Sequence, residues 1–469
     1  ISYYGFDKAL DKFTGMFSIG LWDKKNKQLY LAIDRMGEKP LYYGFAGNDF
    51  IFASELKALK KHNDFKNDIE INSLTNFLQY SYIPAPLSIY KNIYKLSPGE
   101  RLCINKEEFN TKTKLTNLNK KKWFQLNNLI QNSKRNSFIN YNDAKHNIEN
   151  TLVNSIKLQS ISDVSLGVFL SGGIDSSLIA SLKAKKMGQK IDTFTMAFED
   201  SNYNEALYAR KIANNLQTNH NELTVNKKNI NNIITDLYNI YDEPFADSSQ
   251  IPTTLLCQTA KTKLSVCLTG DGGDEIFGGY NRYIWLMKLW KRIYILPKFI
   301  KYLIIKFINF IPTSDLKKLD AFFNIIISSK KKNIHFIFNK LDRLSKNLIN
   351  IKSKEDLYHT FINVWLNVNE IIDCEIKDHY FNYKSDLFTE EKLNFPEKMM
   401  YVDTLTYLPY DILVKVDRAS MYSSLETRAP FLDINVIENA WRLPYHMRVS
   451  NNSGKVILKD IMNDYCQKN

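Results

Sequence analysis

The sequence at residues 166–177 is Leu166-Gly167-Val168-Phe169-Leu170-Ser171-Gly172-Gly173-Ile174-Asp175-Ser176-Ser177, a short apolar run that leads into a loop of glycine, serine and aspartate. Two adjacent glycines allow a tight turn and a close approach of the backbone to a ligand. Leu178, Ile179 and Leu182 follow at helical spacing. The loop is therefore expected to enter a helix, whose N-terminus attracts anions. This stretch predicts a pyrophosphate-binding loop at residues 171–177, called the first loop below.

The residue types of the first loop fit a phosphate ligand. Ser171, Ser176 and Ser177 offer hydroxyl groups, and Gly172 and Gly173 offer accessible backbone N–H groups. Asp175 would repel phosphate unless a cation lies between them, so its position suggests Mg²⁺. An ordinary strand-to-helix turn also uses glycine, serine and aspartate. The full S-G-G-x-D-S-S pattern behind an apolar strand favours the phosphate site.

A second loop of similar character follows the apolar run at residues 264–269. It reads Thr269-Gly270-Asp271-Gly272-Gly273-Asp274-Glu275 and carries three carboxylates within five residues. Such carboxylates repel one another without compensation. A solvated acidic turn is the alternative, but apolar residues both precede and follow this loop. A metal–pyrophosphate site accounts for both acidic clusters, with Asp175, Asp271 and Asp274 as candidate metal ligands.

The pattern around these loops is that of an α/β fold. Apolar runs at residues 166–170, 193–198, 222–225 and 264–269 are expected strands, and helical spacing at 178–187 and 206–216 separates the first three. This alternation predicts a doubly wound parallel sheet, in which ligands bind beyond the carboxyl ends of the strands. Both loops lie at such ends. Residues from about 284 onward are expected to be mostly helical, and lysines within 293–311 argue against a membrane span there.

The N-terminal region has a different pattern, with short strands and turns. Strands are expected at 13–21 and 29–33 around a polar turn, and at 42–45 and 50–53 as a second hairpin. Residues 105–140 are rich in lysine, asparagine and threonine and are interpreted as a connection. A helix is expected next, because Ala144, Ile148, Leu152 and Ile156 recur at helical spacing. The predicted domains are therefore 1–104, the connection 105–140, and 141–469.

Bulk composition excludes several classes of protein. The 469 residues suffice for two or three domains. The net charge of +13 comes from scattered lysines, and the clusters at 120–122 and 330–332 lack the interleaved aromatics of a single-strand binder. We expect a solvated surface, with neither a nucleic-acid partner nor a membrane partner. The five cysteines form no CxxC pair, which indicates a reducing compartment, expected to be the cytoplasm. The chain starts at Ile1 rather than methionine, so a fragment is expected.

Several motifs together resemble those of glutamine-dependent asparagine synthetases. The two loops resemble the synthetase domain of that family. Other segments are similar to further family signatures, in the expected order along nearly the whole chain: residues 241–249 (Tyr-Asp-Glu-Pro-Phe-Ala-Asp-Ser-Ser), 417–421 (Asp-Arg-Ala-Ser-Met), 426–433 (Glu-Thr-Arg-Ala-Pro-Phe-Leu-Asp) and 454–459 (Gly-Lys-Val-Ile-Leu-Lys).

The N-terminal region resembles the back half of the family's class II glutamine amidotransferase, or glutaminase, domain. The segments that carry this resemblance are residues 15–17, 34–43, 54–59, 84–86 and 96–99. It implies a partial Ntn-type αββα layer in front of a PP-loop ATP pyrophosphatase domain with added helices. The family's glutaminase uses an N-terminal cysteine as nucleophile. This chain has none near its start, so it is not expected to hydrolyse glutamine by itself.

The resemblance implies two half-reactions. ATP activates the side-chain carboxylate of aspartate as β-aspartyl-AMP with release of pyrophosphate, and ammonia from glutamine then displaces AMP. ATP and Mg²⁺ are the implied cofactors, and Lys455, Tyr280 and Asp271 are the catalytic candidates. The expected nucleotide-binding residues are Leu170, Ser171, Gly172, Gly173, Asp175, Ser176, Ser177, Met196, Thr269 and Gly270. Core packing is the alternative for Leu170, Met196 and Tyr280. A homodimer is compatible with the sequence, which does not fix the oligomeric state.

Three other functions stay open at this point. An amidotransferase paralogue could act on another carboxylate, such as a sugar acid in surface-polysaccharide synthesis or the precursor of a β-lactam. A non-catalytic nucleotide-binding scaffold is disfavoured because Asp175, Asp271, Asp274 and Lys455 are all present. Nucleic-acid binding through the net charge would be salt-sensitive and is the least favoured.

Overall fold

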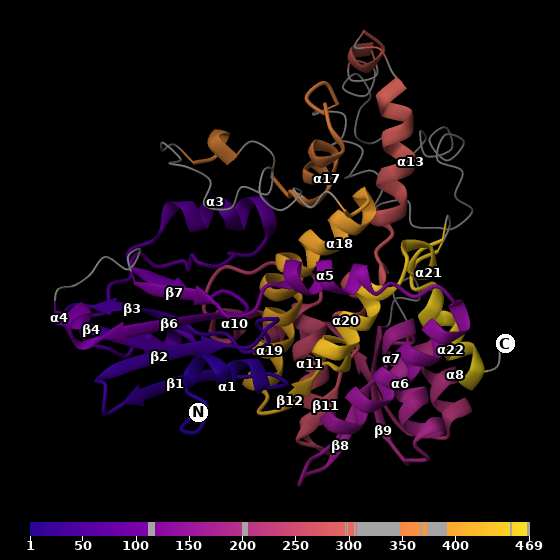
Figure 1. Ribbon diagram of the computed structural model, residues 1–469, viewed down its shortest axis with the longest axis horizontal. Coiled ribbons are helices and arrows are strands. Elements are labelled where there is room, and N and C mark those ends of the chain that lie inside the picture. The colour runs from indigo at the N-terminus through magenta and orange to yellow at the C-terminus, as the bar shows by residue number, and fades with distance from the viewer. Residues whose placement is uncertain are drawn as a thin grey trace. The chain divides into compact units, whose positions relative to one another are not determined.

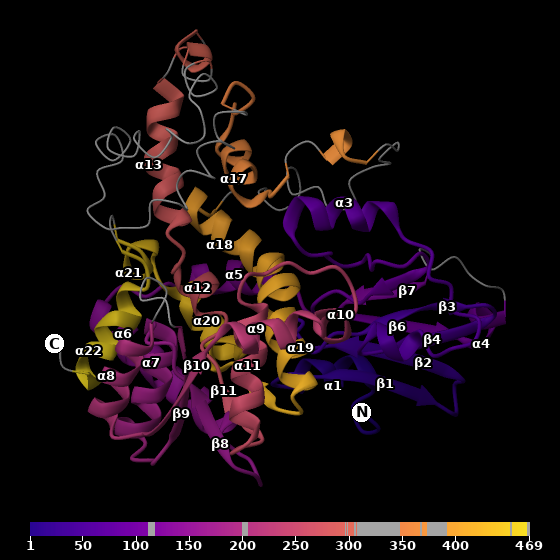
Figure 2. The same cartoon turned by 180° about the vertical axis from the view of Figure 1, so that it is seen from behind.

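The structure, a computed structural model, describes residues 1–110, 118–198, 205–295, 297, 299–303, 306, 348–365, 368–372, 392–450 and 453–466 (Figures 1 and 2). It divides into two compact units. The first contains Ile1–Phe77, Ser81–Tyr280 and Met400–Asn469, and the second contains Leu78–Tyr80 and Asn281–Met399. Part of the stretch 293–311 and the whole lysine cluster 330–332 lie outside the described residues.

A five-stranded parallel sheet forms the centre of the C-terminal part of the first unit. The strand order is β10-β9-β8-β11-β12, and every neighbouring pair is parallel. The strands are β8 (Leu166–Phe169), β9 (Asp192–Phe198), β10 (Asn219–Val225), β11 (Val266–Leu268) and β12 (Glu426–Arg428). The predicted parallel sheet is confirmed. The polar edge strand β12 was not predicted, because its three residues carry no apolar run.

The strand order explains where a ligand can bind. From β8 the chain moves outward to β9 and β10, then crosses back to β11 on the other side of β8. Since such crossovers share one hand, α7 (Ile174–Ser181) and α8 (Ala206–Leu216) cover one face of the sheet and α11 (Gln250–Lys261) covers the other. The point where the order reverses, between β8 and β11, is the usual ligand crevice of such sheets. Both predicted loops emerge there.

Apolar side chains hold the remaining helices against this sheet. Phe194 of β9, Cys257 of α11 and Cys267 of β11 pack with Ala419 and Leu425 in one buried cluster. The predicted helix around residues 144–156 is confirmed as α6, and its four predicted apolar residues are fully buried. The other helices of this part are η2 (Leu182–Lys186), α9 (Lys227–Ile234), α10 (Leu237–Tyr241), α12 (Gly273–Phe277), η6 (Leu408–Ile412), α19 (Leu413–Tyr422), η7 (Pro430–Leu432), α20 (Ile434–Arg442), α21 (Tyr445–Arg448) and α22 (Val456–Tyr465), with α6 spanning Tyr141–Gln159.

Two antiparallel sheets form the N-terminal part of the same unit. One has the order β1-β2-β6-β7 and the other β4-β3-β5, so both predicted hairpins are confirmed. Leu31, Ile33, Tyr43, Leu102 and Ile104 are buried together in the core of this part. Its elements are α1 (Phe6–Lys12), β1 (Ser18–Asp23), β2 (Gln28–Ile33), β3 (Tyr42–Ala46), β4 (Asp49–Ala53), α2 (Leu56–Leu59), α3 (Ile71–Tyr80), β5 (Ile93–Lys95), β6 (Glu100–Asn105), α4 (Lys106–Asn110), β7 (Asn119–Lys122) and α5 (Leu126–Arg135). The described residues of the predicted connection 105–140 thus include one strand, β7, and two helices, α4 and α5.

The second unit is helical where it is described. Its helices are α13 (Arg282–Ile295), α17 (Lys354–Ile362) and η5 (Val368–Glu370), and α13 packs against α17. α18 (Phe395–Leu405) runs from this unit into the first. Within the described ranges, the chain has no helix with the length and apolar character needed to cross a membrane.

Candidate active site

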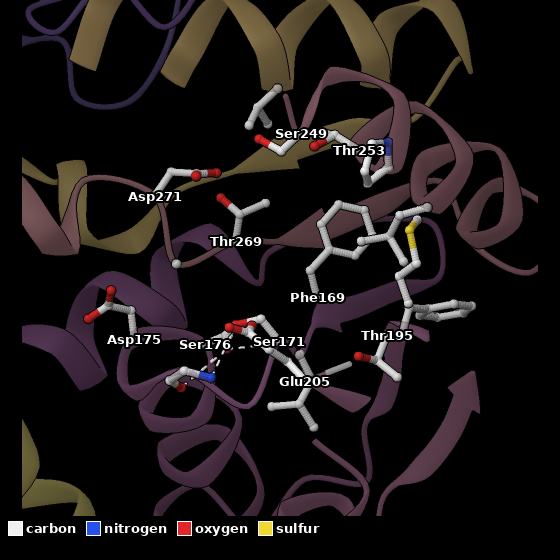
Figure 3. A pocket seen from close by; sticks show the side chains of 18 of the residues that line it. Phe169, Ser171, Asp175, Ser176, Thr195, Glu205, Ser249, Thr253, Thr269 and Asp271 are labelled. Carbon is white, nitrogen blue, oxygen red and sulfur yellow. Dashed lines mark hydrogen bonds between the residues drawn. The ribbon is translucent and has the colours of Figure 1, made fainter. Parts of the chain in front are cut away.

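A cavity of about 500 Å³ opens at the carboxyl ends of the central strands (Figure 3). Phe169 and Thr195 lie at one end of it, and Asp175 and Asp271 lie at the other. Eleven of the predicted site residues line it: Leu170, Ser171, Gly173, Asp175, Ser176, Met196, Thr269, Gly270, Asp271, Asp274 and Lys455. The structure therefore brings the two loops and the late lysine segment together around one cavity.

The first loop is shorter than predicted, because helix α7 begins at Ile174 rather than after Ser177. The hydroxyl of Ser176 stabilises this early start. It accepts a hydrogen bond from the Ser171 backbone N–H at 3.1 Å and donates one to the Gly173 carbonyl at 3.4 Å. Asp175, Ser176 and Ser177 consequently lie in the first turn of the helix, where its positive end attracts anions.

Three predicted residues do not line the cavity. Gly172 has φ 79°, and a Cβ there would lie 2.8 Å from Tyr208 Cβ and from the Ala209 nitrogen, so close packing against α8 requires glycine. Ser177 is fully buried below the loop. Tyr280 donates a hydrogen bond of 2.6 Å to Glu275 Oε1, away from the cavity lining.

Lys455 connects the two loops electrostatically. Its ammonium nitrogen lies 2.6 Å from Asp274 Oδ1 and also forms an ion pair with Asp175 Oδ2. Burial lowers the pKa of Lys455, but the two carboxylates outweigh burial and hold the pKa above its ordinary value. Lys455 has φ 56°, a left-handed conformation that is costly for a side chain and common at functional positions. The lysine is therefore held charged between the loops.

The three predicted metal ligands are not assembled as a ready metal site. Among the described residues, no three His, Cys, Asp or Glu side chains converge to hold a metal ion. Asp175 nevertheless fits a cation. Burial raises its pKa to about 6 despite the nearby Lys455, and its Oδ1 is buried without a hydrogen-bond partner among the described atoms. Mg²⁺ typically takes one or two carboxylates and completes its shell with phosphates and water, so this arrangement suits Mg²⁺ that arrives with a nucleotide.

The other two carboxylates of the second loop differ in exposure, because Glu275 is buried and Asp271 is partly exposed. Burial raises the pKa of Asp271, while the charge of Lys415 and a hydrogen bond from the Thr269 side chain oppose this rise. Burial also raises the pKa of Glu275, to about 8, and Tyr280 satisfies this carboxyl group. Glu275 is thus buried outside the cavity lining, where it packs beneath the second loop, whereas Asp271 lines the cavity.

The structure adds lining residues that the motifs did not identify. Lys415, Ser249 and Thr253 come from α19 and from the start of α11, and Figure 3 shows Ser249 and Thr253 across the cavity from Ser171 and Ser176. Phe169, Thr195 and Glu205 also line the cavity. A signal for Ser249 was available, since it closes the segment 241–249. Lys415 stands two residues before the segment 417–421 and had no motif of its own.

A second, small cavity of about 20 Å³ reaches the same loop from the N-terminal part of the unit. It shares Thr269 and Asp271 with the large cavity and is lined on its other side by Met16, Glu38 and Lys39. Its size suits one small molecule such as water.

Comparisons with known proteins agree with this architecture. The family model described as Asparagine synthase matches residues 147–469, and the one described as Glutamine amidotransferase domain matches residues 1–115. The asparagine synthetase (glutamine-hydrolyzing) 1 of Bacillus subtilis is 29% identical over 462 residues, which cover 97% of this chain and 66% of that protein. A putative asparagine synthetase (glutamine-hydrolyzing) 2 of Methanocaldococcus jannaschii is 33% identical over 286 residues, which cover 60% of this chain and 52% of that protein.

The chain thus spans about two thirds or less of the length of these relatives. Among solved structures, the NH3-dependent NAD synthetase of Campylobacter jejuni, in complex with nitrate, has a TM-score of only 0.24. Its sequence is 14% identical, and the match covers 51% of this chain and 100% of the NAD synthetase chain. This similarity is too weak to support a conclusion about fold or function. The family match rests on sequence and extends over well over half of the chain, so the protein belongs to the asparagine synthase family.

Proposed function

We propose that this chain carries the synthetase activity of an ATP-dependent asparagine synthetase. It would transfer AMP to the side-chain carboxylate of aspartate, release pyrophosphate, and form asparagine when ammonia displaces AMP. The observation that carries this proposal is the arrangement of Lys455, Asp175 and Asp274 beside the first loop, in a cavity of about 500 Å³. Cavities of roughly 300–1,000 Å³ are typical of small-molecule and cofactor sites.

The cavity supports a definite direction for ATP. Its end formed by Phe169, Thr195 and Met196 is largely apolar and suits the adenine ring. The first loop and the start of α7 offer backbone N–H groups and a positive helix end to the phosphates. Lys455 lies at the far end beside Asp175 and Asp274, where negative charge develops on the departing pyrophosphate. In this orientation the α-phosphorus faces the middle of the cavity.

The chemistry needs little covalent participation by the protein. An oxygen of the substrate carboxylate attacks the α-phosphorus, and the bond to pyrophosphate breaks on the opposite side. Charge stabilisation by donors fixed in advance is the main catalytic contribution in such steps. Lys455 would provide it through its buried ammonium, and the loop N–H groups would provide the remainder. Asp271 would face the acyl group from the second loop, where it could accept a proton from the incoming ammonia.

Mg²⁺ would be held mainly by Asp175, with Asp271 and Asp274 as the other candidate ligands. When bound, it would supply Lewis-acid stabilisation of the phosphate oxygens. The unpartnered Oδ1 of Asp175 is the protein atom that favours this assignment.

Ammonia would come from glutamine through the N-terminal amidotransferase part. The small cavity lined by Met16, Glu38 and Lys39 supports this proposal, because it adjoins Asp271 on the side that faces the N-terminal sheets. The domain limits 1–104 and 141–469 remain predictions. They agree with an N-terminal part that supplies ammonia and a C-terminal part that forms the amide. A cytoplasmic location also remains a prediction; the four cysteines in the described ranges are free thiols.

The test is pyrophosphate release by the purified protein with ATP, MgCl₂, aspartate and ammonium chloride, with asparagine measured in parallel. We expect release that depends on aspartate and falls at least about 100-fold in Asp175→Asn. The matched control is Asp163→Asn, an exposed aspartate ahead of β8, which should retain activity. Release that is independent of aspartate, or that depends only on another acid, would contradict the proposed substrate.

A further inference from the structure

One carboxylate of the cavity lining takes no part in the mechanism proposed above, that of Glu205. The lining contains four acidic residues, and the other three belong to the two loops: Asp175, Asp271 and Asp274. Glu205 directly precedes α8, where its backbone carbonyl accepts hydrogen bonds from the N–H groups of Tyr208, at 3.0 Å, and Ala209, at 3.2 Å. The start of α8 therefore holds Glu205 in the cavity wall.

The contact between α8 and the first loop limits the part of the cavity that Glu205 can reach. The first turn of α8 lies directly against the loop, because a Cβ at Gly172 would lie 2.8 Å from Tyr208 Cβ. In Figure 3, Glu205 is labelled between Ser171 and Thr195. Ser171 belongs to the loop proposed for the phosphates, and Thr195 belongs to the end proposed for adenine. Glu205 thus lies between these two places.

The part of ATP that would occupy this intermediate place is the ribose, because the sugar joins the adenine to the phosphates. Its two hydroxyl groups are neutral hydrogen-bond donors. A carboxylate repels phosphate but accepts hydrogen bonds from hydroxyl groups. Such bonds to a charged acceptor are roughly twice as strong as bonds between neutral groups. The chemistry of Glu205 therefore suits the sugar of the nucleotide and not its phosphates.

The Glu205 carboxylate is available for a ligand. Its side chain does not cap α8. Within the described ranges of the chain, no other group forms a hydrogen bond or an ion pair with it. Partial burial raises the pKa of Glu205, and hydrogen bonds from hydroxyl groups would favour its charged form. A sugar diol would supply the donors that this carboxylate lacks.

The position of Glu205 relative to the sheet has a parallel in other nucleotide-binding folds. In dinucleotide-binding α/β sheets, an aspartate or glutamate that follows the glycine-rich loop in the chain hydrogen-bonds the ribose 2′-hydroxyl. Glu205 follows the first loop and then β9, the strand that pairs with β8. This parallel is an analogy of position, and it agrees with the place of Glu205 in the cavity.

We propose that the Glu205 carboxylate accepts hydrogen bonds from the ribose hydroxyls of ATP, so that the site selects ribonucleotides over deoxyribonucleotides. This inference rests on the proposed function and deepens it by naming a residue that selects the nucleotide. One competing explanation is that Glu205 is only a solvated residue at the start of α8. Another is that Glu205 helps to hold Mg²⁺. Neither explanation predicts that Glu205 distinguishes nucleotides that differ in a single hydroxyl group.

The experiment compares ATP with 2′-deoxyATP and 3′-deoxyATP, each with MgCl₂. Pyrophosphate release is measured with aspartate and ammonium chloride. In the wild-type protein we expect kcat/KM for ATP to exceed that for at least one deoxy analogue by about 10- to 100-fold. In Glu205→Ala this preference should fall to about 3-fold or less, through loss of the ATP reaction alone. Glu205→Gln keeps a carbonyl acceptor of similar size and should retain part of the preference.

A control variant and a binding measurement separate recognition of the sugar from other effects. Glu222→Gln is the matched control, because Glu222 pairs with Arg210 of α8 at 2.7 Å and lies outside the cavity lining. It should keep the preference for ATP. Isothermal titration calorimetry with the same three nucleotides needs no turnover. The wild-type protein should bind ATP at least about 10-fold more tightly than the less favoured analogue, and Glu205→Ala should bind the two within about 3-fold.

The outcomes are distinguishable. Equal use and binding of all three nucleotides by the wild-type protein would refute the inference and leave the proposed function standing. An unchanged preference in folded Glu205→Ala would do the same. Weaker binding of all three nucleotides to this variant in an unchanged ratio, with a higher requirement for MgCl₂, would assign Glu205 to the metal instead. No pyrophosphate release with any acid, together with a preference for ATP in binding that depends on Glu205, would refute the proposed function alone.

Discussion

The ammonium nitrogen of Lys455 lies 2.6 Å from Asp274 Oδ1, an ion pair that joins the residue before α22 to the first turn of α12. Asp175 of the first loop shares the same ammonium group. This one lysine therefore ties together the three segments on which the proposed pyrophosphate site depends.

Replacing Lys455 should affect catalysis and stability together. In Lys455→Met we expect kcat for pyrophosphate release to fall about 100- to 1,000-fold, because a fixed donor to developing negative charge is lost. The free energy of unfolding should also fall, by about 3 kcal/mol, since two carboxylates lose their partner. Steady-state kinetics and urea denaturation measure the two effects.

The control is Lys459→Met, one turn along α22 and outside the cavity lining. It should keep kcat within about 3-fold of the wild-type value. Equal losses in both variants would show that disruption of α22, rather than loss of the Lys455 charge, causes the effect.

Gly279 is expected to be essential for the same ion pair. A Cβ at this position would lie 1.8 Å from Asp274 Oδ1 and 2.2 Å from Lys455 Cε. Gly279→Ala should therefore separate the two charges and lower kcat at least about 10-fold, without removing any functional group. Gly188→Ala is the control, since its Cβ would meet open space at φ 65°. It should cost roughly 1 kcal/mol of stability and leave kcat unchanged. A fully active Gly279→Ala would argue that the ion pair is not needed in this geometry.

The sequence was most informative where chemistry and local structure coincide. Residues 166–177 combine an apolar run with glycine and serine, and both the strand β8 and the position of the loop followed from that pattern. The helix start at Ile174 did not follow, because Ser176 bonds back to Ser171 only once the turn has formed. Tyr280 was predicted as a catalytic candidate from a resemblance alone, and its hydroxyl bonds to Glu275 instead of lining the cavity.

Lys415 shows why the rest of the site could not be predicted. Its partner Ser249 is 166 residues away in sequence, and no local spacing encodes that contact. A lysine in an amphipathic helix is an ordinary surface residue until the fold buries it. The same holds for β12, whose place at the sheet edge comes from pairing with β11 and not from its own polar residues.

We expect the environment of His220 to lower the free energy of unfolding of the protein at mildly acidic pH. Burial lowers the pKa of His220 below the ordinary 6.5. The charge of Glu222 raises this pKa, and the charge of Arg210 lowers it. Its Nδ1 contacts Thr193 Oγ1 at 2.9 Å, and its Nε2 is buried without a partner among the described atoms. The folded state therefore favours the neutral ring, so this contribution is complete above pH 6.5 and is lost as the pH falls below it.

The measurement is the difference in urea midpoint between pH 7.5 and pH 5.5. We expect His220→Gln to show a smaller difference than the wild-type protein, because glutamine does not titrate. An identical difference in both proteins would assign the acid sensitivity to other groups.

The contact between the N-terminal sheets and the parallel-sheet part includes a buried ion pair, Lys95–Glu243. Both side chains are about one-tenth exposed or less. Glu243 also accepts hydrogen bonds from the Tyr42 hydroxyl and the Ile89 backbone N–H, each at 3.2 Å. Lys95 additionally donates to the Ile83 carbonyl at 2.6 Å. Either single replacement, Glu243→Leu or Lys95→Met, leaves one buried charge without its partner and should destabilise the protein by about 3–5 kcal/mol.

The double variant should cost less than the sum of the single ones, because no unpaired charge remains. A coupling energy of about 1–3 kcal/mol in a double-mutant cycle, from urea denaturation at constant m, is the expected result. The exposed pair Arg210–Glu222 provides the comparison, and its cycle should give about 0.5 kcal/mol. Additive losses at Lys95 and Glu243 would mean that the two charges are separately solvated. In that case hydrogen bonds and apolar packing alone, and not the ion pair, would hold the N-terminal sheets to the segment 241–249.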